Sequence, residues 1–202
     1  MRSAAMDKTA LCLLIGGESQ RMKQDKAQLR LPSGKMLVEL MVEKLTQLAP
    51  APIFLSGDKQ FSELSNLPNI PDIFKNKVGP VGAIISCGKY LAQYFPRLEQ
   101  MTLIPVDIPN LSINSLQQLH ASTAAAAYFA NNPLPLKLKI TPQLLTVIDE
   151  LILPINSAGG YSVRQFMAKL DSYETLIIND PDELLNFNYP EQWLNYISSI
   201  TQ

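Results

Sequence analysis

Apolar residues along this chain fall into two kinds of pattern: short apolar or alternating runs, and longer stretches with an apolar residue every three or four positions. The first kind is typical of strands, and the second of helices that bury one face. Strands are predicted at residues 9–15, 53–56, 101–105, 124–130, 134–140 and 176–178, with a further short strand at 27–31. Helices are predicted at residues 36–48, 80–92, 112–119, 142–151, 163–170 and 189–200.

Strands and helices alternate from one end of the chain to the other, which is typical of a sheet covered by helices on both faces. We therefore expect a three-layer α/β fold in a single domain spanning residues 1–202. The irregular stretch at 128–140 predicts at least one antiparallel strand, so the sheet should be mixed but mostly parallel. Residues 59–71 predict a loop with one helical turn. The last helix is expected to turn one apolar face to the core: Trp193, Leu194, Ile197 and Ile200.

The first predicted strand ends in a stretch with particular chemistry. Leu14-Ile15-Gly16-Gly17 is followed closely by two cations, Arg21 and Lys26. Glycines at the carboxyl end of a buried strand let a bulky anion approach backbone N–H groups, and open α/β sheets bind ligands at this edge. The pattern predicts a nucleotide-phosphate loop in which Arg21 and Lys26 meet the phosphates.

The same residues are also compatible with purely structural roles. A Gly-Gly pair is often a plain turn, and two cations can form a solvated basic face. The loop also lacks the Gly-Lys-Ser/Thr of a Walker A sequence and the three glycines of a dinucleotide fingerprint.

Two aspartates are candidates for binding a metal or a nucleotide. Asp107 follows the predicted strand at 101–105, in Pro105-Val106-Asp107-Ile108-Pro109, and Asp72 lies in a loop after residues 53–56. Mg²⁺ takes one or two protein carboxylates together with substrate phosphates, so Asp107 is the predicted metal ligand. A turn or cap role is the alternative for both residues.

A third candidate segment is Gly79-Pro80-Val81-Gly82. Proline fits the first position of a helix, where its missing N–H has no cost. The two glycines would let a flat base or ribose pack against the backbone, or would serve only the geometry of the helix start.

Composition excludes several classes of protein. The apolar share of 47% and the charged share of 17% indicate a globular chain. The formal net charge of -1 gives no reason to expect nucleic acid or a membrane surface as a partner. No apolar run approaches the ~18 residues of a membrane span, and residues 1–8 do not resemble a signal peptide. We therefore expect a cytoplasmic protein.

The cysteines and the lone histidine favour structural roles. Cys12 and Cys87 fall in predicted core segments and are expected to be buried thiols, neither a disulfide nor a metal pair. His120 ends a predicted helix, where a cation would complement the helix dipole. With one histidine, neither a catalytic triad nor a histidine-based metal site is expected.

Four segments occur in a particular order along the chain. They are Gly-Gly-Glu-Ser-Gln-Arg-Met-Lys-Gln-Asp-Lys at 16–26, Val-Gly-Pro-Val-Gly-Ala-Ile at 78–84, Pro-Val-Asp-Ile-Pro-Asn-Leu at 105–111 and Phe-Asn-Tyr-Pro-Glu at 187–191. Together they resemble the molybdenum cofactor guanylyltransferases. In that family Gly-Gly, Arg-Met-Gly and Asp-Lys recur at the spacing of the first segment. Gly-Pro-Leu-Ala-Gly, Pro-Cys-Asp-Met-Pro-Phe-Leu and Asn-Ile-Asn-Thr-Pro-Glu follow in the same order.

The resemblance implies a Rossmann-like nucleotidyltransferase fold and a Mg²⁺-dependent reaction. The terminal phosphate of molybdopterin attacks the α-phosphate of GTP, pyrophosphate leaves, and a guanine dinucleotide cofactor forms. Catalytic roles are implied for Arg21, Lys26 and Asp107, with Asp107 holding Mg²⁺. Nucleotide contacts are implied at the residues around these: Leu14, Ile15, Gly16, Gly17, Lys26, Asp72, Gly79, Pro80, Gly82 and Asp107.

The implied partners are GTP and molybdopterin or the molybdenum cofactor. The protein is expected to be a monomer or to make transient contacts with other proteins of the cofactor pathway. Relatives that use CTP, or that act on a sugar or alditol phosphate, form a first alternative. A paralogue that binds nucleotide without catalysis forms a second.

The chain departs from the family pattern at four places. Lys23 stands where the family has glycine, and Ile15 where it has alanine. Residues 55–58 read Leu-Ser-Gly-Asp where the family has an Asn-Arg-Asn-like run, and residues 131–134 read Asn-Asn-Pro-Leu where it has Arg-x-His-Pro-Leu. The last two segments, which would help to recognise the base and the pterin, therefore lack the family's cations.

Overall fold

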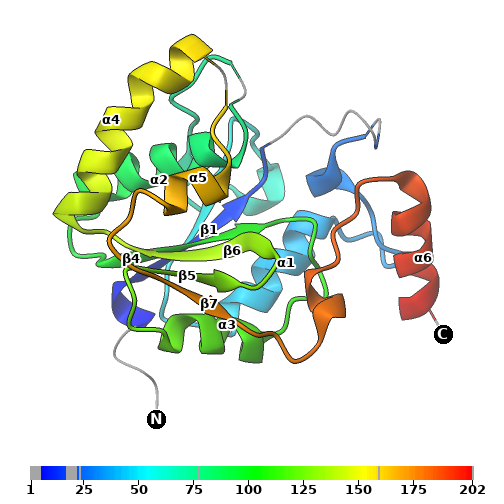
Figure 1. Ribbon diagram of the computed structural model, residues 1–202. Coiled ribbons are helices and arrows are strands. Elements are labelled where there is room, and N and C mark those ends of the chain that lie inside the picture. The colour runs from blue at the N-terminus through cyan, green and yellow to red at the C-terminus, as the bar shows by residue number, and fades with distance from the viewer. Residues whose placement is uncertain (1–5, 17–21, 23, 77, 159, 202) are drawn as a thin grey trace.

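The described part of the chain forms one sheet with helices on both faces (Figure 1). A computed structural model describes residues 6–16, 22, 24–76, 78–158 and 160–201, and their side chains apart from those of 156–158. The strands are β1 (Thr9–Leu14), β2 (Ile53–Ser56), β3 (Asn69–Ile70), β4 (Gln100–Pro105), β5 (Ala126–Phe129), β6 (Asn132–Lys139) and β7 (Tyr173–Leu176). The α-helices are α1 (Leu37–Thr46), α2 (Pro80–Tyr94), α3 (Ile113–Ala121), α4 (Pro142–Ala158), α5 (Val163–Met167) and α6 (Pro190–Ile200).

The strands lie in the order β3-β2-β1-β4-β6-β5-β7. β1 pairs in parallel with both β2 and β4, and β6 runs antiparallel between β4 and β5. The predicted mixed, mostly parallel sheet is thus confirmed. The chain leaves β1 towards β2 on one side and later returns to add β4 on the other, so the strand order reverses between β1 and β4. Ligands of such sheets bind at the carboxyl ends of the strands on either side of this reversal.

The two faces of β1 belong to two separate apolar cores. Leu11 and Leu13 pack with the buried residues of α1 and α3, whereas Ala10 and Cys12 pack with those of α2, α4 and α5. This follows from the two-residue period of a strand, because successive side chains point to opposite faces. Both layers of helices are therefore held by one continuous apolar strand, as the sequence pattern predicts.

The prediction of a strand at 27–31 is wrong. The segment begins with a 3-10 helix, η2 (Lys26–Gln28), and only Arg30 makes an isolated bridge, to Met36. The carboxylate of Asp25 accepts a hydrogen bond from the N–H of Ala27, at 3.1 Å. This N-cap stabilises a turn in place of an extended backbone.

Both ends of the sheet also differ from the prediction. β7 covers Tyr173–Leu176 and not 176–178, and Ile177 is exposed. β7 pairs with β5 at the edge of the sheet and is mostly exposed, so it needs no apolar run. At the opposite edge β3 (Asn69–Ile70) lies inside the segment predicted as a loop, and its one helical turn is the 3-10 helix η3 (Ser62–Leu64).

The predicted core face of α6 is only partly correct. Trp193 is buried, and Tyr196 and Ile197 pack beside the core. Leu194 and Ile200 are 61% and 47% exposed. Leu194 follows Trp193 directly and so lies about 100° further round the helix, beyond the reach of the core.

His120 is partly buried and neutral rather than a cation at the end of α3. Its Nε2 lies 2.8 Å from the hydroxyl of Thr102. Burial, together with the nearby charge of Lys137, lowers the pKa of His120 to about 4. The cation at this helix end is Lys137, a buried lysine on β6 whose ammonium donates to the carbonyls of Ser122 and Ala124 at 2.8 and 3.1 Å.

The two cysteines are buried free thiols, as predicted. A hydrogen bond with Cys87 and burial raise the pKa of Cys12. In the part of the chain that the structure describes, no helix has both the length and the apolarity that crossing a membrane requires.

Candidate functional site

A cavity of about 550 Å³ opens at the carboxyl ends of the central parallel strands. It is lined by Ser56, the last residue of β2, and by Gly16 and Asp107, each the second residue after the end of β1 and β4. The start of α2 forms a second wall, and residues 132–134, Leu184 and Asn186 contribute part of the rest. The cavity thus lies where the strand order reverses, the position at which open α/β sheets bind ligands.

The cavity brings together every predicted site residue that the structure describes. These residues are Leu14, Ile15, Gly16, Lys26, Asp72, Gly79, Pro80, Gly82 and Asp107. Gly17 and Arg21 lie outside the described residues, as does Lys23. Residues far apart in the sequence therefore share one site, and their chemical roles remain predictions.

Lys26 and Asp107 form an ion pair in the wall of the cavity. The ammonium nitrogen of Lys26 lies 2.5 Å from Oδ2 of Asp107, and the two side chains are 17% and 15% exposed. The same ammonium donates to Oδ1 of Asn188 at 3.0 Å. Partial burial weakens solvent screening, so this pair holds the lysine more firmly than a surface ion pair would.

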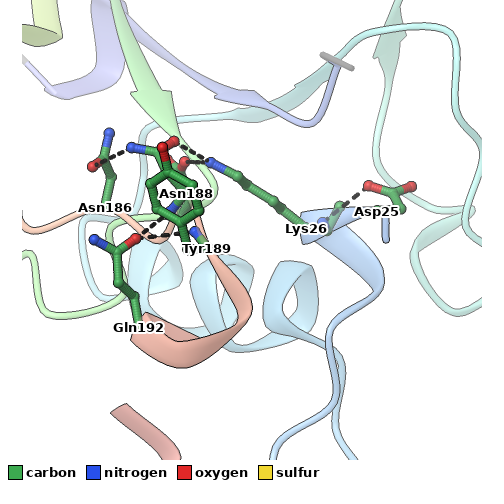
Figure 2. Close-up of polar contacts among 8 residues, drawn as sticks. Asp25, Lys26, Asn186, Asn188, Tyr189 and Gln192 are labelled. Carbon is green, nitrogen blue, oxygen red and sulfur yellow. Dashed lines mark hydrogen bonds and ion pairs between the residues drawn. The ribbon is translucent and has the colours of Figure 1, made fainter. Parts of the chain in front are cut away.

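The direction of Lys26 is set by the residue before it. Asp25 caps η2, the short helix that Lys26 begins, and in Figure 2 the two side chains extend in different directions. Oδ1 of Asp25 also lies 2.7 Å from the ammonium of Lys59, in the segment after β2. The Asp-Lys sequence therefore fixes the start of η2 with one side chain and presents the other to Asp107.

Asn186 and Asn188 complete the cluster around Lys26 (Figure 2). Nδ2 of Asn188 donates to Oδ1 of Asn186 at 3.0 Å, and Asn186 lines the cavity. Oε1 of Gln192 accepts the backbone N–H groups of Asn188 and Tyr189, at 2.7 and 3.0 Å. Rings of Phe187 and Trp193, 5.5 Å apart, pack beside this segment.

Sequence reasoning did not place these asparagines in the site. The segment at 187–191 resembles the family's closing motif, and that resemblance was the available signal. Other lining residues that were not predicted are mostly neutral or apolar: Ser56, Phe74, Asn76, Val78, Ala83, Asn132, Pro133, Leu134 and Leu184. Residues 132–134, where the family has cations, thus bring amide and apolar groups to the cavity.

The loop after β2 touches the glycine loop backbone to backbone. Gly57 has a φ of 136°, and a Cβ there would lie 2.9 Å from the nitrogen of Gly16. A Cβ on Gly16 itself would meet nothing closer than 3.6 Å. The protein's own packing therefore requires glycine at 57 but not at 16, so the small residue at 16 leaves room in the cavity.

The two glycines at the start of α2 have different requirements. Gly79 has a φ of 73°, which side chains rarely adopt, and nothing lies within 4 Å of a Cβ there. A Cβ on Gly82 would lie 2.5 Å from Cγ2 of Val78. Gly82 therefore serves the packing of the helix start in addition to lining the cavity, whereas Gly79 serves the backbone conformation.

Asp72 is held by its backbone at the edge of the cavity. Its N–H donates to Oδ1 of Asp58 at 3.1 Å, so the segment after β2 fixes the segment that follows β3. Oδ2 of Asp72 lies 3.8 Å from the position of a Cβ on Gly16. A carboxylate thus lies close to the glycine loop.

The described residues contain no group of three or more His, Cys, Asp or Glu side chains suited to a metal ion. Asp107 nevertheless fits a hard divalent cation that shares its ligands with a substrate. Asp107 lines the cavity, and carboxylate oxygens are donors that suit Mg²⁺ or Mn²⁺. The donor set therefore favours a cation that arrives with a phosphate ligand over one held by the protein alone.

The fold and the cavity define the class of this chain: an α/β protein whose ligand cavity lies at the carboxyl ends of its parallel strands. Residues 11–173 match the family model described as MobA-like NTP transferase domain. The chain belongs to this family. The expected nucleotidyltransferase fold is thereby confirmed.

Curated relatives and solved structures agree with this assignment. The molybdenum cofactor guanylyltransferase of Xanthomonas euvesicatoria pv. vesicatoria is 29% identical over 188 residues, which cover 92% of each chain. That of Rhizobium rhizogenes is 30% identical over 107 residues, which cover 53% of this chain and about half, 49%, of the relative. The crystal structure of molybdopterin-guanine dinucleotide biosynthesis protein A from Archaeoglobus fulgidus has a TM-score of 0.73. It is 17% identical and covers 95% of this chain and 98% of its own, a match in fold.

Proposed function

We propose that this protein transfers GMP from GTP to the terminal phosphate of molybdopterin. The observation that carries the proposal is the cavity in which Gly16, Asp72 and the Lys26–Asp107 pair meet, in a chain of the MobA-like NTP transferase family. Names of relatives aligned over 92% of the chain support the choice of acceptor and nucleotide. Pyrophosphate and a guanine dinucleotide are the products.

The residues suit a reaction in which the acceptor supplies its own nucleophile. A phosphate oxygen of the acceptor forms a bond to the α-phosphorus of GTP, and the bond to the pyrophosphate oxygen breaks. The protein has to orient the two phosphates and offset their charge. Backbone at Gly16 and the ammonium of Lys26 would bind the triphosphate, with Gly17 and Arg21 as further ligands predicted from the sequence.

Mg²⁺ is the divalent cation that we propose for Asp107. When bound, it would neutralise charge on the phosphates that it shares with this carboxylate. Lys26, in contact with Asp107, would contribute a second positive charge to the same region. Ile15 and Pro105 are among the wall residues that would limit water at this point.

We propose guanine as the base because its hydrogen-bond donors match the acceptor oxygens of the Asp72 carboxylate. Guanine offers adjacent N1–H and N2–H donors, which one carboxylate can accept together, whereas the Watson–Crick edge of cytosine offers only its amino group. Asp72 is the carboxylate on the wall between β2 and the start of α2. Gly79, Pro80 and Gly82 line the same side, where a flat base or ribose would meet little side-chain bulk.

The test is a turnover assay with purified protein, Mg²⁺, GTP and molybdopterin. We expect release of one pyrophosphate for each guanine dinucleotide formed, both measured in the same reaction. CTP in place of GTP should give little product. Nucleotide binding without pyrophosphate release, beside an active guanylyltransferase as positive control, would identify a binding paralogue and contradict the proposal.

A second candidate is a nucleotidyltransferase with a different acceptor, such as a sugar or alditol phosphate. The observation that favours it is the neutral lining at Asn132, Pro133 and Leu134, where the family has cations. A panel of phosphorylated acceptors in the same assay separates the two. Turnover with an alditol phosphate and none with molybdopterin would favour this candidate.

A further inference from the structure

The proposed reaction assigns no task to the asparagine that contacts Lys26. We propose that Asn188 is a positioning residue, which holds the ammonium of Lys26 at the cavity wall as a neutral acceptor opposite Asp107. The inference rests on the proposed function only in taking a polyphosphate as the ligand that Lys26 meets. Asn188 itself acts through Lys26 and is not proposed as a ligand of the substrate.

The geometry gives Lys26 two partners of different charge. Its ammonium lies 2.5 Å from a carboxylate oxygen of Asp107 and 3.0 Å from the amide oxygen of Asn188. A lysine side chain has four rotatable carbons and three ammonium donors, so a single ion pair leaves its position loosely defined. The second acceptor, from a segment 162 residues away in sequence, fixes the ammonium between β4 and the C-terminal segment.

Asn188 is itself fixed at two points. Its Nδ2 donates to Asn186, which leaves Oδ1 as the atom that faces Lys26. Its backbone N–H is held by Gln192, which also accepts the N–H of Tyr189 at the start of α6 (Figure 2). A loosely held amide could rotate away, whereas this one is bonded at its backbone and at both ends of its side chain.

A neutral acceptor has a consequence that a carboxylate would not have. An amide oxygen binds the ammonium without adding a negative charge, so Lys26 is balanced by Asp107 alone and the group of three side chains stays neutral. A second carboxylate would hold Lys26 more tightly and would repel a phosphate. Asparagine at 188 therefore fixes the position of the ammonium without making its surroundings net negative.

The experiment measures dissociation constants for GTP with Mg²⁺, and in parallel for inorganic triphosphate with Mg²⁺, by calorimetry on the full chain. We expect Asn188→Leu to weaken binding of both about 5- to 30-fold, which is the range expected for one charge-assisted contact. Asn195→Leu, which adds the same residue at an exposed site on α6, is the matched control and should bind within twofold of the parent.

The decisive comparison is a double-mutant cycle with Lys26→Met. If Asn188 acts through Lys26, Asn188→Leu should have no further effect, within about twofold, once the lysine is gone. A further loss of the same size in the Lys26→Met background would mean that Asn188 binds the ligand directly or acts only on folding, and would overturn the proposal. So would binding by Asn188→Leu within twofold of the parent.

Asn188→Asp tests the need for a neutral acceptor. It keeps an oxygen for Lys26 but adds a negative charge, so we expect weaker binding than in the parent, with a deficit that shrinks as salt concentration rises. Binding as tight as in the parent would contradict the neutral-acceptor argument. Fluorescence of Trp193, the single tryptophan, reports whether the segment beside Phe187 keeps its native packing in each variant.

Failure of the inference and failure of the proposed function give different results. A parent that binds triphosphate but not GTP would contradict the proposed function, and the cycle would still be measured on triphosphate. If the parent binds GTP but the double-mutant cycle shows no coupling between Asn188 and Lys26, the inference alone is contradicted. A parent that binds neither would contradict both.

Discussion

At the scale of single residues, this site depends on where a few charges are held. Lys26 and Asp107 are each about one-sixth exposed and lie in contact, so their charges act in a partly desolvated wall. A change that removes one charge leaves the other facing the same cavity. Substitutions that preserve shape are therefore the most informative at these positions.

Asp107→Asn removes a charge with little change in volume. We expect turnover to fall at least about 100-fold. Among the described residues of the cavity wall near β4, Asp107 is the only carboxylate that could bind the proposed divalent cation, and the substitution removes it. The fold should remain, because Lys26 keeps Asn188 as a partner. Initial rates of pyrophosphate release, with circular dichroism as the folding check, measure both effects.

Asp182→Asn is the matched control, since Asp182 is an exposed carboxylate in the 3-10 helix η4 (Pro181–Leu184) and does not line the cavity. It should leave the rate unchanged. A rate for Asp107→Asn within a few-fold of the parent would remove Asp107 from the site.

His120 makes stability depend on pH below neutrality. Its pKa is about 4 in the folded protein, against an ordinary value of 6.5, because of burial and the charge of Lys137. Between these values the unfolded chain binds a proton that the folded protein excludes, so stability falls as pH is lowered from 6.5 to 4. The loss attributable to this residue is on the order of 3 kcal/mol.

Urea denaturation at a series of pH values measures this effect, and His120→Gln provides the comparison. Glutamine can still bond to Thr102 but does not titrate, so its free energy of unfolding should fall less between pH 6.5 and 4. The carboxylates titrate alike in both proteins, which isolates the contribution of the histidine. Parallel curves for the two proteins would show that His120 is not the cause.

At the scale of elements, the cavity depends on loops that follow β1 and β2 and meet without side chains between them. Gly57 combines a φ of 136° with a Cβ position only 2.9 Å from the nitrogen of Gly16. A side chain at 57 would therefore displace the backbone on which phosphate binding is predicted. The backbone at Gly16 thus packs directly against Gly57, a glycine that was not among the residues predicted for the site.

Gly57→Ala should both destabilise the fold and weaken nucleotide binding. Strain at positive φ costs about 1–3 kcal/mol, and the clash with Gly16 should add a loss of GTP affinity of about tenfold or more. Gly34→Ala is the matched control, because Gly34 has a φ of 84° and nothing within 4 Å of its Cβ position.

Thermal denaturation and calorimetry on both variants separate strain from contact. Both should lose stability, but only Gly57→Ala should lose affinity. Equal affinities in the two variants would mean that the loop contact does not shape the binding site.

At the scale of the whole molecule, the sequence was sufficient for the layers but not for the edges or for the whole site. Buried strands carry mostly apolar runs: β2 was predicted with its observed bounds, Ile53–Ser56, and β1 and β4 were predicted to within one residue. β7 was misplaced because an edge strand that is mostly exposed carries no such run. In the site, Lys26 and Asp107 stood out as charges after strands. Asn186 and Asn188 are neutral amides, and the contact that joins them to the site, from Asn188 to Lys26, spans 162 residues of sequence. Only the folded chain brings them together.

Ligand binding should stabilise the molecule as a unit, because the cavity is lined by β1, β2, β4, α2 and the segment before α6. A ligand that binds only the folded state at ~100 times its dissociation constant adds about 2.7 kcal/mol. For a chain of this size that corresponds to a rise in Tm of roughly 5–10 °C. We expect this rise with GTP and Mg²⁺ and a smaller rise with CTP at the same concentration, since Asp72 can accept two donors from guanine.

Lys26→Met should reduce the rise in Tm caused by GTP, because the triphosphate loses a cation that binds it. Lys89→Met, on the exposed face of α2, should not reduce it. A larger shift with CTP than with GTP would reverse the proposed base preference while leaving the site in place.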